Sequence, residues 1–186
     1  DVPAYKIASF ENIDLPLIQK IAEQGKPVIL STGMANAKEI QEAVDTIRKT
    51  GNDQIILLKC TSAYPTPPEE MNLRTIPDMV KRFGVPVGLS DHTLGIAVPV
   101  AAAALGACVI EKHFCLSRSE PGPDTAFSLE PQEFRAMVDA VRTAEKALGN
   151  ASYSCTEKEQ GSVVFRRSLF AVKDIAAGEP FTEHNI

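Results

Sequence analysis

The stretch Val87-Gly-Leu-Ser-Asp-His92-Thr93 leads into a run of small apolar residues, and Val109-Ile-Glu-Lys-His113-Phe114 follows that run. Both stretches begin with apolar residues and carry titratable residues only at their ends. We interpret them as two β-strands joined by one helix. A (β/α) barrel presents its reaction site in this way, because the carboxyl ends of its strands open onto one face.

The two strand-end histidines, His92 and His113, are candidate ligands for a divalent metal. Two ligands cannot close a structural zinc site, so an open site for chemistry is the better interpretation. A single isolated histidine more often caps a helix, bonds to the backbone, or lies in the core with its hydrogen bonds made. The occurrence of a histidine at equivalent ends of two successive strands favours the metal site instead.

Three more apolar runs, residues 4–10, 27–33 and 54–60, predict strands, and helices are expected over residues 15–24, 37–49, 73–82 and 131–148. The strands are continuous apolar runs, which indicates a parallel sheet covered by helices. Five strand-helix units favour an α/β fold of the barrel type, although five are too few for a complete eight-stranded barrel. An open doubly wound sheet is the alternative.

Composition and charge exclude several classes of function. The net charge of -5 gives no reason to expect a nucleic acid or an acidic membrane surface as partner. The longest apolar run, residues 96–105, is too short to span a membrane. The cysteines, at positions 60, 108, 115 and 155, form no CxxC pair, and we expect buried reduced thiols in a cytoplasmic protein. A metal role for Cys115 is less favoured than packing.

Lysine and hydroxyl side chains near the strand ends are candidate donors to an anion. A lysine inside an apolar strand is costly unless it meets an anion, so Lys6 is the strongest of these candidates. The alternatives are a lysine that reaches out to solvent or a Schiff-base nucleophile. We expect Lys59 and Lys112 to point outward to salt bridges.

Five motifs, taken in order, resemble the sialic acid synthase family over almost the whole chain. They are Lys6-Ile-Ala-Ser-Phe-Glu11, Ile29-Leu-Ser-Thr-Gly-Met34, Lys59-Cys-Thr-Ser-Ala-Tyr-Pro65, Gly88-Leu-Ser-Asp-His-Thr93 and Ile110-Glu-Lys-His-Phe114, followed by Gly122-Pro-Asp124. Enzymes of this family condense phosphoenolpyruvate with an N-acetylated amino sugar to give a nonulosonic acid.

The resemblance implies a TIM-type (β/α) barrel, of which residues 1–149 would be about five C-terminal βα units. Residues 150–167 would be a linker, although residues 162–175 have the composition of a strand. Residues 168–186 would begin an antifreeze-like (SAF) domain. Relatives swap that domain onto the partner's active site, so a domain-swapped homodimer is expected of the full-length protein.

By the same resemblance, His92 and His113 hold a divalent metal, typically manganese. The positions that match phosphoenolpyruvate-binding residues are Lys6, Ser9, Ser31, Ser62, Tyr64 and Ser90. Glu11 and Asp124 match positions near the sugar, and Ser62 stands where neuraminate synthases have Asn. We assign catalytic roles to Lys6, which would position the anion, and to Glu11, which would transfer a proton or orient the attacking water.

Phe10 and the pair Arg166-Arg167 favour the branch of the family whose acceptor is 2,4-diacetamido-2,4,6-trideoxy-L-altrose. Synthases of N-acetylneuraminate or legionaminate are the alternatives. A 3-deoxy-sugar-acid synthase would need a second phosphate site, and the strand ends carry no further cluster of arginine or lysine. A non-catalytic carbohydrate-binding module would need aromatic platforms, and the sequence has no Trp.

Overall fold

The structure of the chain is a computed structural model that describes residues 2–186. The chain divides into two compact units, Asp1–Gly149 and Asn150–Ile186. The roles expected for residues 150–167, a linker, and for residues 168–186, the start of an antifreeze-like domain, stay predictions.

The first unit is built on a five-stranded sheet. Its strands are β1 (Tyr5–Ile7), β2 (Val28–Ser31), β3 (Ile55–Cys60), β4 (Val87–Asp91) and β5 (Ile110–Lys112). They are all parallel and lie side by side in chain order. A doubly wound sheet reverses its strand order at a switch point, so the observed order excludes that alternative. The prediction of a parallel α/β fold of the barrel type is confirmed.

Helices alternate with the strands. They are α1 (Leu15–Ala22), α2 (Ala37–Lys49), α3 (Thr75–Phe83), α4 (Ala97–Ala104) and α5 (Pro131–Leu148), with 3₁₀ turns η1 (Ser9–Glu11), η2 (Pro68–Glu70) and η3 (Thr125–Phe127). Capping residues determine where some of these helices begin and end. The Asn36 side chain accepts two backbone N–H groups at the start of α2, and Gly84, in the left-handed region, ends α3.

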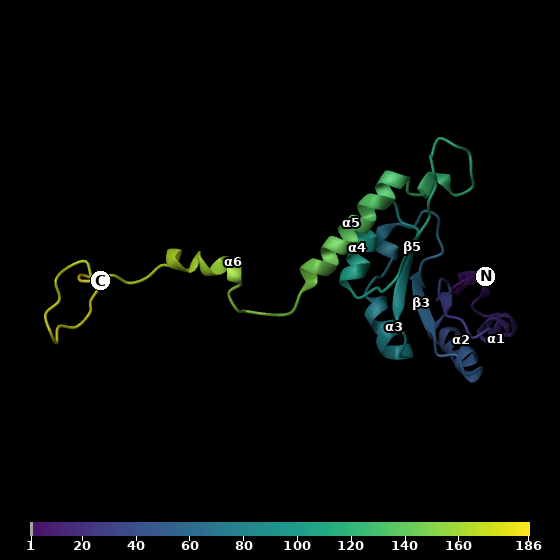
Figure 1. Cartoon of the computed structure of the whole chain (residues 1–186), viewed down its shortest axis with the longest axis horizontal. Helices are drawn as coiled ribbons and strands as arrows, with labels where there is room; N and C mark the ends of the chain where they lie inside the picture. The colour runs from purple at the N-terminus through teal and green to yellow at the C-terminus, as the bar shows by residue number, and fades with distance from the viewer. Residues whose placement is uncertain (1) are drawn as a thin grey trace. The chain divides into compact units, whose positions relative to one another are not determined.

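The hydrophobic core lies between the sheet and the helices, on one face of the sheet. Leu30, Leu57 and Leu89 from neighbouring strands belong to one buried cluster with helical residues such as Ile18 and Ile47. α1 lies beside α2, and α4 lies beside α5 (Figure 1). Since side chains alternate along a strand, residues 6, 31, 58, 90 and 111 project from the other face.

The sheet is curled, and two side chains from its outer strands show how strongly. In a flat sheet β1 and β5 would lie about 19 Å apart, four spacings of about 4.8 Å. The ammonium of Lys6 on β1 nevertheless lies 3.6 Å from the carboxylate of Glu111 on β5. The face without helices is therefore concave, and the first unit is a half-barrel.

The second unit contains α6 (Glu157–Gln160) and the 3₁₀ turn η4 (Val163–Phe165). Residues 162–175 have the composition of a strand but form no strand in the structure. β-forming residues make a strand only where a second strand offers its backbone groups. Val172 donates a single hydrogen bond to the Asn185 carbonyl oxygen (3.0 Å), which is not a ladder.

All four cysteines are free, but only Cys60 is buried. Cys108 and Cys155 are exposed, so the expectation of buried thiols is wrong for these two. Both lie outside the helices and strands. Within residues 2–186, no helix combines the length and the apolar character needed to cross a membrane.

Gly88 allows β4 to approach β5. A Cβ atom at this position would lie 2.5 Å from the Val109 carbonyl oxygen and 2.8 Å from Cδ2 of Leu58. Gly88→Ala must therefore push the two strands apart, and we expect it to destabilise the fold by about 1–3 kcal/mol, the usual cost of overpacking. Urea unfolding measures this difference.

The matched control is Gly161→Ala, because a Cβ atom there meets nothing within 4 Å. The control should leave the unfolding midpoint unchanged. An equally unchanged midpoint for Gly88→Ala would contradict the close approach of β4 and β5.

Candidate active site

The two histidines follow the ends of neighbouring strands and lie next to each other. The register pairs Asp91 at the end of β4 with Lys112 at the end of β5, so the next residues along both strands are His92 and His113. Their ring centroids are 5.3 Å apart and the planes make an angle of 62°. The structure thus brings together the two predicted metal ligands.

Hydrogen bonding determines which nitrogen of His92 is available. Nδ1 lies 2.9 Å from the carbonyl oxygen of Thr61. A carbonyl oxygen can only accept, so Nδ1 carries the proton and Nε2 keeps its lone pair. Burial lowers the pKa of His92 below its ordinary value, which keeps the ring neutral at pH 7. A neutral imidazole with Nε2 free is the form that binds a metal.

His113 has a similar arrangement on its Nδ1 side. Its Nδ1 lies 3.6 Å from the Asp124 carboxylate. A carboxylate or carbonyl at one ring nitrogen orients a histidine for a metal at the other. Among residues 2–186, no three His, Cys, Asp or Glu side chains group in a way that could hold a metal. Two histidines alone cannot close a structural site, so a divalent metal bound here would keep open coordination positions, and this metal stays a prediction.

Tyr64 and Phe127 pack around the histidines. The Tyr64 ring centroid is 4.1 Å from that of His92, and the Phe127 centroid is 5.0 Å from that of His113. Tyr64 was predicted from the resemblance, whereas Phe127 was missed. Phe127 is buried in a 3₁₀ turn at the end of a long loop, and nothing in its local sequence distinguishes it.

Ser9 and Ser62 converge on the turn after β2. A Cβ atom on Gly33 would lie 2.5 Å from the Ser9 hydroxyl oxygen and 2.6 Å from that of Ser62. Only glycine, at its positive φ of 25°, leaves room for both hydroxyls. Ser31, just before this turn, is buried and its hydroxyl oxygen has no hydrogen-bond partner. These three predicted residues form a small polar cradle.

Ser90 and Lys6 meet at a residue that was not assigned to the site. Ser90 donates a hydrogen bond of 2.6 Å to Glu111, whose other carboxylate oxygen is 3.6 Å from the Lys6 ammonium. Glu111 lies on the same strand face as His113, two residues away. The alternation of side chains along a strand could have pointed to it.

Asn12 was also missed, although its burial marks it. The side chain is 1% exposed, and its amide donates to the Ser31 carbonyl oxygen at 3.3 Å. Its own oxygen, Oδ1, has no hydrogen-bond partner. Asn12 and Ser31, which this amide hydrogen bond joins, thus each carry one buried side-chain oxygen without a partner. Buried polar atoms are rarely left in this state unless a ligand or water completes them.

Glu11 makes a hydrogen bond within its own turn in the structure. Its carboxylate accepts the backbone N–H of Ala8 (2.8 Å) and so closes the turn η1. The described contacts do not connect it with either histidine or with Lys6. The catalytic role assigned to Glu11 stays a prediction, and the neighbouring Phe10 is 69% exposed at the same end of β1.

Lys112 and Lys59 do not point outward to surface salt bridges. The Lys112 side chain is 1% exposed and forms an ion pair with Asp91. The prediction of an ion pair is therefore confirmed for Lys112, but the prediction that its side chain points outward is wrong. Both lysines share strand faces with core residues, beneath the helices. Lys59 donates to the Cys60 carbonyl oxygen (2.8 Å) and to the Thr61 hydroxyl (3.0 Å), and burial lowers its pKa.

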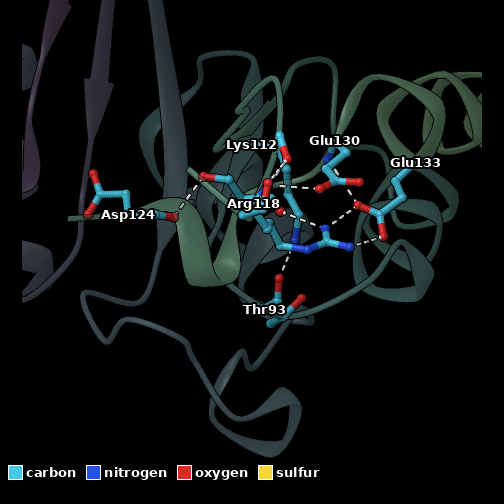
Figure 2. Close-up of polar contacts among 9 residues, drawn as sticks. Thr93, Lys112, Arg118, Asp124, Glu130 and Glu133 are labelled. Atoms are coloured by element: carbon cyan, nitrogen blue, oxygen red, sulfur yellow. Dashed lines mark hydrogen bonds and ion pairs between the residues drawn. The ribbon is translucent and has the colours of Figure 1, made fainter. Parts of the chain in front are cut away.

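The loop that carries Asp124 extends beyond β5 (Figure 1). Contacts between its two ends hold the loop in place. Phe114 and Leu129 form a parallel bridge there. Figure 2 shows Arg118 reaching Glu133 at the start of α5, with two hydrogen bonds to that carboxylate, one of them 2.8 Å long. Hydrogen bonds from Arg118 lower the pKa of Glu133 to about 2.

Comparison with known proteins identifies relatives of the chain. Residues 1–153 match the NeuB family. The chain is 50% identical over 186 residues to pseudaminic acid synthase of Campylobacter jejuni subsp. jejuni serotype O:23/36 (strain 81-176), covering all of this chain and 54% of that protein. It is 46% identical to N,N'-diacetyllegionaminic acid synthase of Campylobacter jejuni subsp. jejuni serotype O:2 (strain ATCC 700819 / NCTC 11168), over 98% of this chain and 55% of the other.

A solved structure shows the same fold. N-acetylneuraminic acid synthetase from Leptospira borgpetersenii serovar Hardjo-bovis, in complex with citrate, matches with a TM-score of 0.80 and 37% identity. The match covers 90% of this chain and 59% of that one. The chain spans about half the length of the curated relatives it matches. The resemblance to sialic acid synthases is confirmed.

The Arg118 contact makes the stability of the loop base depend on pH. The folded pKa of Glu133, about 2, lies below its ordinary value of 4.5. The contribution of Glu133 to stability is therefore complete above about pH 4.5 and is lost as the pH falls toward 2. Urea midpoints of the wild type and Glu133→Gln should differ at pH 7, and this difference should shrink at pH 3.

Arg118→Met supplies the control for this prediction. With the guanidinium removed, Glu133→Gln should have a smaller and less pH-dependent effect. A difference between wild type and Glu133→Gln that is the same at pH 7 and pH 3 would contradict the lowered pKa.

Proposed function

Because this chain belongs to the NeuB family, we propose that it carries the site of a synthase that condenses phosphoenolpyruvate with an N-acetylated amino sugar. The observation that carries the proposal is the pair His92 and His113, with Nε2 of His92 free, beside a concave face lined by hydroxyls and Lys6. Metal ligands and anion donors on one face are what such a reaction requires.

The proposed reaction joins three molecules and releases phosphate. C3 of phosphoenolpyruvate supplies the electron pair for a new bond to the aldehyde carbon, and the aldehyde oxygen takes up a proton. Water adds to the electron-poor C2, and the C2–O bond to phosphate then breaks, with its electron pair leaving on phosphate. One water proton balances the proton taken by the aldehyde oxygen, and the other leaves with phosphate, so C2 becomes a ketone.

The residues on the concave face would bind and orient the anion. We propose that Lys6 and the hydroxyls of Ser9, Ser31, Ser62 and Ser90 hold the phosphate and carboxylate of phosphoenolpyruvate. The support is that the Ser31 hydroxyl oxygen lacks a hydrogen-bond partner, and that the Lys6 ammonium, which donates to the Ile7 carbonyl oxygen at 3.3 Å, lies 3.6 Å from the partly exposed carboxylate of Glu111. Charge-assisted hydrogen bonds to an oxyanion are the strong ones.

Glu111 would change its contacts when this anion binds. Lys6 and Ser90 both face its carboxylate. A bound phosphate would compete for Lys6, while Ser90 could turn its hydroxyl toward the substrate. Glu111 would thus keep the two donors aligned, which is a positioning contribution.

His92 and His113 would bind a divalent cation, manganese in this proposal. A cation here supplies Lewis-acid polarisation of the sugar aldehyde. The protein's own contribution is to orient both rings, through Thr61 for His92 and Asp124 for His113. The sugar would lie beside Asp124, Tyr64 would belong to the phosphoenolpyruvate site, and Glu11 stays the candidate for proton transfer.

For the acceptor we propose 2,4-diacetamido-2,4,6-trideoxy-L-altrose, which would make the full-length protein a pseudaminic acid synthase. Identity of 50% to a pseudaminic acid synthase supports it, but 46% to a legionaminic acid synthase makes the margin narrow. The exposed Phe10 ring would occupy space that a glycerol-like tail needs and would tolerate a terminal methyl group. A methyl contact is worth only about 1 kcal/mol, so steric exclusion of the glycerol-like tail must provide most of the discrimination between the two acceptors.

The full-length protein should convert phosphoenolpyruvate and the trideoxy-altrose acceptor to a nonulosonic acid, and should give little product with N-acetylmannosamine. Mass spectrometry of product, with phosphate release measured in parallel, tests both statements. Removal of divalent metal with a chelator should abolish turnover, and added Mn²⁺ should restore it.

The controls separate the parts of the proposal. Comparable turnover of N-acetylmannosamine, or of the legionaminic acceptor, would move the assignment to another branch of the family. No product with any of the three acceptors would contradict the proposed reaction itself.

Lys6→Met should weaken the binding of phosphoenolpyruvate by about 1.5–3 kcal/mol, the range for a hydrogen bond to a charged group. Methionine keeps much of the apolar stem and removes the charge. Calorimetric titration of the full-length variant with phosphoenolpyruvate measures the change.

Lys59→Met is the matched control, because Lys59 is a half-buried strand lysine on the opposite face of the sheet. The control should bind phosphoenolpyruvate as the wild type does. If Lys6→Met also keeps its affinity, Lys6 has a structural role only.

A further inference from the structure

Lys112 ties together the backbone on both sides of His92. Its ammonium lies 2.6 Å from the Asp91 carboxylate and also donates to the Thr93 carbonyl oxygen, toward which it points in Figure 2. The other oxygen of the Asp91 carboxylate accepts the Thr93 N–H at 3.0 Å. The two residues that flank His92 are thus both bound to one lysine, and that lysine precedes His113.

This ion pair is buried to a degree that is rare for charged groups. The side chains of Lys112 and Asp91 are 1% and 0% exposed. They lie on the face of the sheet that otherwise packs apolar residues, such as Leu89 and Ile110, against helices. Taking both charges out of water is costly, and well-packed apolar residues in the place of such a pair are often as stable or more stable. Stability alone does not account for the pair.

The place of the pair in the strands gives it a second consequence. Asp91 and Lys112 are paired in the register of β4 and β5, and the histidines are the next residues on each strand. Since side chains alternate, the ion pair lies under one face while both imidazoles project from the other. A change in the distance between Asp91 and Lys112 would be passed directly to His92 and His113.

We propose that the Asp91–Lys112 pair is a positioning device that fixes the separation and orientation of His92 and His113 for a divalent cation. This inference rests on the metal site of the proposed function. Neither residue touches the cation or a substrate. The pair acts through the strand ends, whose backbone would otherwise be free to shift at the turn Asp91-His92-Thr93.

The deciding experiment separates stability from metal affinity in the full-length protein. Asp91→Leu combined with Lys112→Met removes both charges and keeps apolar volume, so no buried charge is left unpaired. The readouts are the urea unfolding midpoint and the dissociation constant for Mn²⁺ from calorimetric titration. The visible spectrum of bound Co²⁺ reports the ligand geometry independently of activity.

We expect the double variant to unfold at a midpoint close to that of the wild type but to bind Mn²⁺ about 10- to 100-fold more weakly, as for other residues that orient metal ligands. The Co²⁺ spectrum should change as well. The matched control removes an exposed pair with Arg135→Met and Asp139→Leu, whose side chains meet at 3.0 Å on α5. The control should leave both metal readouts unchanged.

Asp91→Asn keeps an oxygen for the Thr93 N–H and tests the inference if the double variant does not fold. Its folded fraction should also bind Mn²⁺ more weakly. Wild-type affinity in either folded variant would overturn the inference while the metal site stands. If the wild type itself binds no Mn²⁺, or if His92→Ala and His113→Ala bind it equally well, the metal part of the proposed function fails and the inference fails with it.

Discussion

The parallel register between β4 and β5 sets the geometry on which the rest of the site depends. It places Ser90 opposite Glu111, Asp91 opposite Lys112, and then His92 beside His113. Because side chains alternate between the two faces of a strand, the first and third pairs face the concave side and the second faces the helices. One register thus produces a polar pair for anion donors, a buried ion pair, and a pair of imidazoles.

The one-sided burial of the sheet is the second constraint. Helices cover only the convex face, so apolar residues on that face form the core and the concave face can carry polar groups. The curl of the sheet makes those groups converge, as the contact of Lys6 with Glu111 across the sheet shows. A flat sheet of the same sequence would leave these side chains too far apart to act on one molecule.

The loop after β5 completes the site through contacts that are distant from the chemistry. Arg118 and the bridge between Phe114 and Leu129 hold the base of the loop. The loop then brings Asp124 to the Nδ1 side of His113 and Phe127 to its ring. Loops offer few backbone hydrogen bonds of their own, so such side-chain contacts are what fix their course.

The sequence by itself determined the order of strands and helices, the parallel sheet and the strand-end histidines, because these depend on local periodicity and on residue types at strand ends. Its motifs also identified the family and predicted the three serines of the cradle, Ser9, Ser31 and Ser62. Only the tertiary structure decided that Lys112 is buried, that Glu111 joins Lys6 to Ser90, that Phe127 packs on His113, and that residues 162–175 form no strand. The physical reason is the same for each. Burial, pairing and the direction of a long side chain depend on which segment lies opposite, and local sequence does not carry that information.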